Sequence, residues 1–105
     1  VSIAYETWGQ LNSSKSNVVV IFTGLSASSH VTSSDYDSSA GWWEAMVGSG
    51  KAIDSDKHFV VCINTLGSCF GSTSPVSMNE NTEQPYRCHF QNLQLRTWQL
   101  HRICF

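Results

Sequence analysis

The chain has 105 residues, six Lys plus Arg against eight Asp plus Glu, and a formal net charge of −2. A domain usually takes about 100 to 150 residues, so this length fits one small domain at most. Only 13% of residues are charged, and no basic face or ~20-residue apolar run is visible, which argues against nucleic acid and membrane as partners.

The first third of the chain predicts two strands. Residues 2–8 alternate Ile3, Tyr5 and Thr7 with a second set that contains Glu6, and they are rich in strand-forming residues. Residues 9–17 are rich in the turn-forming residues Gly, Asn and Ser, and Leu11 is their one apolar residue. Val18 to Phe22 is a continuous apolar run, which predicts a strand buried on both faces, as in the centre of an α/β sheet.

The middle of the chain predicts a long functional loop, a helix and another buried strand. Residues 23–39 contain seven Ser among seventeen residues, and long loops of this kind tend to be functional. Residues 41–48 predict a short helix bounded by glycines. Residues 58–64 predict a second fully apolar strand, before a loop over 65–85. The order predicts an α/β layer fold with parallel central strands and too few helices for a complete sheet.

The four cysteines, Cys62, Cys69, Cys88 and Cys104, include no C-x-x-C pair. This spacing favours neither a zinc knuckle nor a thioredoxin-type pair. No basic-then-apolar signal peptide is visible at the start of the printed sequence. We therefore expect reduced thiols and a cytoplasmic location, with two disulfides as the alternative.

Two short motifs suggest chemistry but lack their context. Residues 67–71 have the glycine spacing of a nucleophile elbow with Cys69 at its centre, yet Ser and Pro follow where a helix is required. Residues 45–52 are a near miss to a phosphate-binding loop, because the first Gly is missing and Ala52 replaces the magnesium-binding hydroxyl. A helix end at Gly48 and Gly50 is favoured instead. The histidines have no metal-ligand spacing, and we expect neither a metal nor a bound cofactor.

Several segments taken together resemble the homoserine O-acetyltransferases and the related serine O-acetyltransferases. The matching segments are 4–12, 18–22, 25–30, 41–43, 48–62, 64–75 and 85–86. Departures are Ser26-Ala27 where the family usually has Thr-Gly, and Ser68 where it has a second Gly. In the tail only Phe90 and Arg96 follow the family pattern.

The resemblance implies an incomplete α/β-hydrolase-like fold, holding only the first strands of the sheet and the oxyanion loop. Residues 1–87 would be the N-terminal part of an acyltransferase domain, and residues 88–105, which contain no Gly, Pro, Asp or Glu, a divergent or aberrant tail. It also implies transfer of an acetyl group from acetyl-CoA to homoserine or serine, with succinyl as an alternative donor, in methionine or cysteine biosynthesis. A homodimer of the full-length enzyme is a further expectation.

The resemblance implies one site residue in this chain, Leu25, whose backbone N–H would donate a hydrogen bond in the oxyanion hole. No Gly-x-Ser-x-Gly occurs in the chain, and the resemblance places the nucleophile, Asp and His of the triad beyond it. We therefore expect the chain alone to be inactive. The alternatives are a non-catalytic truncated product that associates with a full-length partner, and an independent enzyme that uses Cys69.

Overall fold

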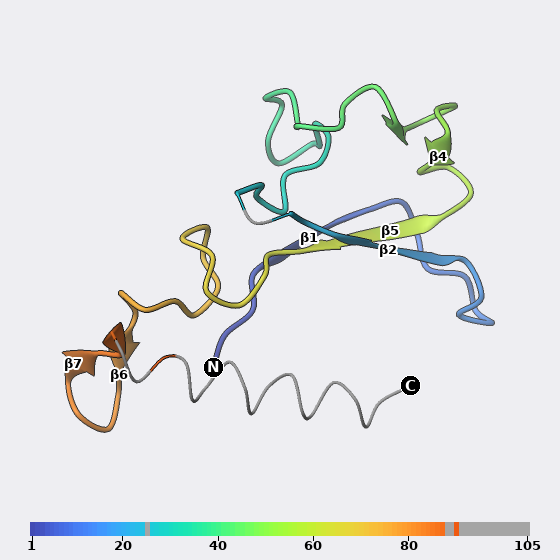
Figure 1. Ribbon diagram of the computed structural model, residues 1–105. Helices are drawn as coiled ribbons and strands as arrows, with labels where there is room; N and C mark the ends of the chain where they lie inside the picture. Colours follow the sequence, from blue (N-terminus) through green and yellow to red (C-terminus); the bar gives the residue numbers. More distant parts are fainter. Residues whose placement is uncertain (25, 88–89, 91–105) are drawn as a thin grey trace.

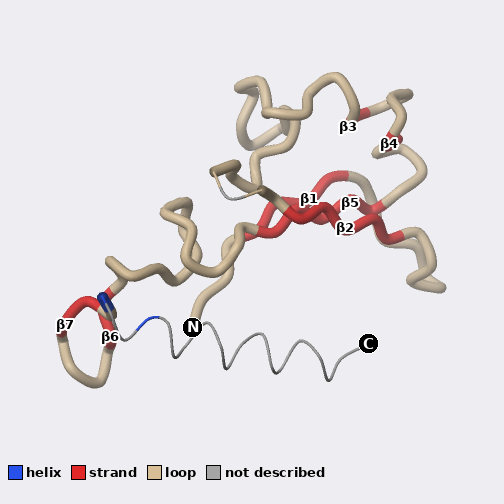
Figure 2. The backbone as a smooth tube through the Cα atoms, viewed as in Figure 1, coloured by secondary structure: helices blue, strands red, loops and turns tan. Residues whose placement is uncertain are grey.

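The computed structural model describes residues 1–24, 26–87 and 90. In this part of the chain, seven short strands form one three-stranded and two two-stranded sheets. The strands are β1 (Tyr5–Trp8), β2 (Val18–Phe22), β3 (Val47–Gly48), β4 (Ile53–Asp54), β5 (Phe59–Ile63), β6 (Met78–Asn79) and β7 (Gln84–Pro85). Loops make up most of the remaining path, as the tube in Figure 2 shows.

The central sheet has the order β1-β5-β2, with β5 in the middle (Figure 1). Strands β2 and β5 are parallel and pair from Val18 with Phe59 to Phe22 with Ile63. This confirms the predicted parallel central strands. The first strand lies antiparallel to β5 and begins at Tyr5 rather than at residue 2.

One face of the central sheet is buried and the other is largely uncovered. The hydrophobic core contains Trp8, Ile21, Val31, Val47, Val60 and Cys62, with Val19 and Ile53 packed against it. On the opposite face, Val18, Val20 and Phe22 are 43%, 46% and 71% exposed. The prediction that this strand is buried on both faces is therefore wrong for the chain as described, because no second layer of described residues covers that face.

The helix predicted over residues 41–48 is also wrong. This segment forms tight turns, with the Met46 N–H donating to the Trp43 carbonyl at 2.9 Å, and it ends in β3. The Glu44 side chain accepts the N–H of Gly41 at 3.0 Å, and Val47 pairs in parallel with Ile53 of β4. These tertiary contacts outweigh the weak helical preference of a segment shorter than a stable helix.

The sequence favours a helix end at the glycines of the phosphate-loop-like segment, and this prediction is wrong. Gly48 belongs to β3, and Gly50 lies in the turn that leads to β4, with a φ angle of 68°. The described residues contain no helix long and apolar enough to cross a membrane. Leu25 and, apart from Phe90, the tail over 88–105 lie outside the described residues, so the proposed boundary at residue 87 stays a prediction.

Candidate functional site

The parallel strands β2 and β5 bring two loops to one edge of the sheet. Ligands of open α/β sheets bind outside the carboxyl ends of parallel strands, so this edge is the first place to look for a site. The Thr23 hydroxyl, directly after β2, donates to the carbonyl of Ile63 at 3.3 Å and lies 3.2 Å from the Thr65 hydroxyl. The Ser-rich loop after β2 and the loop after β5 therefore start side by side.

Asn64, the residue directly after β5, joins these two loops. Its side chain is 2% exposed, and its Nδ2 atom donates to Ser29 Oγ at 3.2 Å and to the Phe70 carbonyl at 2.6 Å. The Ser72 hydroxyl donates to the Asn64 carbonyl at 2.8 Å. Asn64 Oδ1 is buried with no hydrogen-bond partner among the described residues. A buried amide held in this way fixes the relative position of both loops.

Glu6 reaches the same cluster from β1. It pairs in register with Cys62 of the central strand, on the face that carries Trp8 and the core. Its Oε1 atom accepts the Ser29 hydroxyl at 3.2 Å, and its Oε2 atom lies 3.0 Å from His30 Nδ1. One carboxylate therefore holds two consecutive residues of the loop that follows β2.

His30 is surrounded by acceptors. Its Nε2 atom lies 3.0 Å from the Ser39 carbonyl, and Asp37 Oδ2 lies 3.9 Å from Nδ1. The hydrogen bond to Glu6 raises the pKa of His30, the Ser39 carbonyl adds to this, and partial burial opposes it. Because both ring nitrogens face acceptors, the imidazolium is the form that satisfies the whole set.

The two cysteines of the described part behave differently. Cys62 is a fully buried free thiol in β5, and burial raises its pKa to about 11. Cys69 is a free, exposed thiol. The segment after it continues as loop and bends rather than as the helix that a nucleophile elbow requires. The geometry gives Cys69 no activating base within the described residues.

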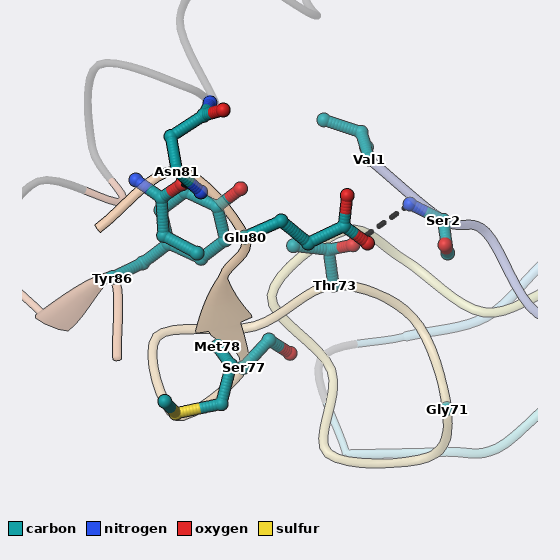
Figure 3. Close-up of a pocket in the computed structure, with 10 residues that line it drawn as sticks. Val1, Ser2, Gly71, Thr73, Ser77, Met78, Glu80, Asn81 and Tyr86 are labelled. Carbon is teal, nitrogen blue, oxygen red and sulfur yellow. Dashed lines mark hydrogen bonds between the residues drawn. The ribbon is translucent and has the colours of Figure 1, made fainter. Parts of the chain in front are cut away.

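A pocket with a different set of lining residues is drawn in Figure 3. It has a volume of about 380 Å³ and is lined by the first two residues and by residues of the segment 71–86, including Glu80 and Tyr86. At its rim the Ser2 N–H donates to Thr73 Oγ1 at 2.8 Å. It shares no residue with the Glu6, Ser29 and Asn64 cluster. No three His, Cys, Asp or Glu side chains of the described part are placed to hold a metal ion.

The site residues found here were not those proposed from the sequence. Leu25 lies outside the described residues, although its loop does begin at the carboxyl end of β2. Glu6, Ser29 and Asn64 were missed. Glu6 carried a usable signal, because strand alternation places this charged residue on the same face as Trp8.

Solved structures with this arrangement define the class of protein. The crystal structure of homoserine O-acetyltransferase from Bacillus anthracis matches 80% of this chain and 25% of its own, with a TM-score of 0.72 and 37% identity. The crystal structure of esterase E22 matches the same shares with a TM-score of 0.70 and 36% identity. The chain therefore has an incomplete α/β-hydrolase-type fold, as its sequence predicted.

Sequence relatives narrow the class. Serine O-succinyltransferase of Stenotrophomonas maltophilia is 56% identical over 93 residues, which is 89% of this chain and 25% of that protein. The same-named protein of Litchfieldella anticariensis is 56% identical over 95 residues, 90% of this chain and 26% of that protein. That of Emericella nidulans is 50% identical over 93 residues, 89% of this chain and 18% of that protein.

The chain thus spans about a quarter or less of the length of these curated relatives. No family model matches it. Over the part that aligns, it is homologous to O-acyltransferases, and the resemblance to the homoserine O-acetyltransferase family is confirmed.

Proposed function

We propose that this chain is part of an O-acyltransferase that moves an acyl group from a coenzyme A thioester to the hydroxyl of an amino acid. The observation that carries the proposal is the 56% identity to serine O-succinyltransferases over 89% of the chain. The paired loops at the carboxyl edge of β2 and β5 agree with it, because this edge is where α/β enzymes place their chemistry.

The proposed reaction has two transfers. A serine nucleophile from outside the printed sequence attacks the thioester carbonyl, the C–S bond breaks, and coenzyme A leaves as the thiol with one proton. The acceptor hydroxyl then attacks the acyl-enzyme ester and gives its proton to the catalytic base. The ester C–O bond to the enzyme serine breaks, and the base returns the proton to the serine oxygen, which restores the free enzyme. Each tetrahedral intermediate carries an oxyanion that needs preorganised N–H donors, and we assign one of these to the backbone of Leu25.

We further propose serine as the acceptor and succinyl as the acyl group. The support is that the sequence relatives named above are serine O-succinyltransferases, all at 50% identity or more. Homoserine as acceptor and acetyl as acyl group are the alternative, because a homoserine O-acetyltransferase of known structure is 37% identical. We also propose that the full-length enzyme is a cytoplasmic homodimer that acts in cysteine or methionine biosynthesis. The 105-residue chain is proposed to be inactive on its own.

A hybrid enzyme tests this proposal. Residues 1–87 of this chain replace the matching segment of the Stenotrophomonas maltophilia protein, and release of the coenzyme A thiol is followed with a thiol-reactive dye. The four combinations of serine or homoserine with succinyl-CoA or acetyl-CoA are compared. We expect turnover fastest with serine and succinyl-CoA. A folded hybrid that releases thiol only by hydrolysis, at a rate independent of either amino acid, would contradict the proposal.

The uncovered face of the central sheet supports a second candidate, a non-catalytic chain that associates with a full-length partner. Val18, Val20 and Phe22 lie exposed on this face, and β2 is an edge strand of the described sheet. Exposed apolar faces and free strand edges mark association surfaces. Co-purification of the tagged chain with the full-length enzyme, lost in Phe22→Ser, would favour this candidate. A monomeric chain that does not bind would exclude it.

A further inference from the structure

We propose that Glu6 is a positioning residue of the acyl transfer, which holds the loop after β2 in place through Ser29 and His30. This rests on the proposed function, because the loop concerned is the one expected to stabilise the oxyanion. Glu6 itself lies on β1, not on the loop. It would act through the residues that it binds rather than by touching substrate.

First, the two carboxylate oxygens of Glu6 bind two different residues of the loop. Oε1 accepts the Ser29 hydroxyl at 3.2 Å, and Oε2 lies 3.0 Å from His30 Nδ1. Ser29 is 5% exposed and the His30 side chain 15%, whereas the Glu6 side chain is 35% exposed, so both bonds are partly shielded from water. A carboxylate that binds two consecutive residues restrains both the position and the direction of the chain there.

The second step is the direction of the hydrogen bonds. Asn64 Nδ2 donates to Ser29 Oγ at 3.2 Å, so the single hydroxyl proton of Ser29 is available for Glu6. The order Asn64, Ser29, Glu6 therefore runs from the residue after β5, through the loop, to β1. The loop is tied to two strands of one sheet at a single hydroxyl, and losing the final acceptor would weaken both bonds.

The third step is the need for a charged acceptor. The Ser39 carbonyl lies 3.0 Å from His30 Nε2, and Ser39 Oγ lies 3.1 Å from it. Glu6 from β1 and Asp37 from the loop itself are the charged groups that face the ring in the described structure. With acceptors on both sides, the ring donates twice only as the imidazolium, which a neutral glutamine in place of Glu6 would not favour.

Nuclear magnetic resonance on the 105-residue chain tests the contact directly. We compare Glu6→Gln with Glu80→Gln, an exposed glutamate outside the cluster. In Glu6→Gln the pKa of His30 is expected to fall towards its ordinary value of 6.5, and amide exchange is expected to quicken at Ser29 and His30 but not in β5. An unchanged His30 titration in Glu6→Gln would overturn the proposal.

Kinetics in the hybrid enzyme test the consequence. Glu6→Gln is expected to lower kcat by about tenfold or more with little change in KM for the acyl donor, since small misplacements of a site can cost about 100-fold. Rates are divided by the concentration of active sites, so that loss of folded enzyme alone does not count. Unchanged kcat with a shifted His30 titration would show an anchor without a role in catalysis, and would overturn the proposal.

Ser29→Ala is the second variant, and it decides the matter if Glu6→Gln does not fold. It removes one partner of Glu6 and of Asn64 but keeps the carboxylate and its ion pair with His30. A lower kcat is expected, and wild-type kcat would contradict the proposal. If the unsubstituted hybrid folds but is inactive, the proposed function fails, whereas the His30 titration still reports separately on the Glu6 contact.

Discussion

The Glu44 carboxylate accepts two hydrogen bonds from Ser33. The Ser33 N–H donates to Oε2 at 2.8 Å and the Ser33 hydroxyl donates to Oε1 at 3.0 Å, across 11 residues of chain. The N–H of Gly41 adds a third bond to Oε2 at 3.0 Å. The backbone N–H of Ser33 and then that of Gly41 lower the pKa of Glu44 to about 2. An ionised Glu44 thus links Ser33 of the long loop to the turns that begin at Gly41.

The stability of the chain should therefore depend on pH through the ionisation of Glu44. Its pKa is lowered on folding from 4.5 to about 2, so the stabilisation is complete above pH 4.5 and is lost as the pH falls towards 2. Glu44→Gln should lower the free energy of unfolding at pH 7 and make its decline below pH 4.5 shallower. Urea denaturation at a series of pH values, with Glu80→Gln as control, measures this. Parallel curves for wild type and Glu44→Gln would contradict it.

Gly41 should not tolerate a side chain. A Cβ atom there would overlap the carbonyl of Val31 and the nitrogen of Thr32, whereas one at Gly24 would meet nothing within 4 Å. We expect Gly41→Ala to cost about 1–3 kcal/mol or more, because the obstacle is backbone that cannot move aside. Gly24→Ala should change the unfolding free energy by less than about 0.5 kcal/mol. Similar denaturation midpoints for the two variants would show that the loop is not held against residues 31–32.

Truncation should destabilise the chain strongly at one residue of β2 and hardly at all at its neighbour. Ile21 is 7% exposed in the core, and Phe22 is 71% exposed on the uncovered face. Ile21→Ala should cost about 2–5 kcal/mol in the isolated chain, while Phe22→Ala should stay within about 0.5 kcal/mol. Chemical denaturation of both variants measures the difference. A large cost for Phe22→Ala would mean that another part of the chain, or a second copy, covers this face.

Asn64 should be sensitive to replacement by its nearest isostere. In Asn64→Asp a carboxylate oxygen would face the Phe70 carbonyl where the Nδ2 donor now lies at 2.6 Å. The lost bond and the buried repulsion should cost about 2 kcal/mol or more. The exposed Asn81→Asp serves as the control in the same denaturation series. Equal midpoints for the two aspartate variants would contradict the assigned role of Asn64.

The two described thiols should differ in reactivity. Burial raises the pKa of Cys62 to about 11, and its side chain is fully buried, whereas Cys69 is exposed. Iodoacetamide at pH 8 should label Cys69 at least about tenfold faster than Cys62, because the thiolate is the reactive form and must be accessible. Peptide mapping by mass spectrometry, before and after unfolding, measures both sites. Early labelling of Cys62 in the folded chain would contradict the buried position of β5.

Local sequence was sufficient for β1, β2 and β5, but not for the short strand pairs β3-β4 and β6-β7 or for the turns before β3. Continuous apolar runs predicted β2 and β5 and their parallel pairing, since such runs are typical of central α/β strands. The turns over residues 41–46 do not form the predicted helix, because the Glu44 side chain binds Ser33 of the preceding loop as well as the N–H of Gly41. A contact 11 residues away leaves no trace in local periodicity.

By itself, the sequence determined the strands β1, β2 and β5, the α/β class and the resemblance to O-acyltransferases, because apolar runs and family motifs are local patterns. Only the tertiary structure decided that Glu6, Ser29, His30 and Asn64 meet at the carboxyl edge of the sheet. It also decided which face of β2 is covered. Both depend on strand register and on the path of the loops, which bring together residues between 23 and 35 positions apart.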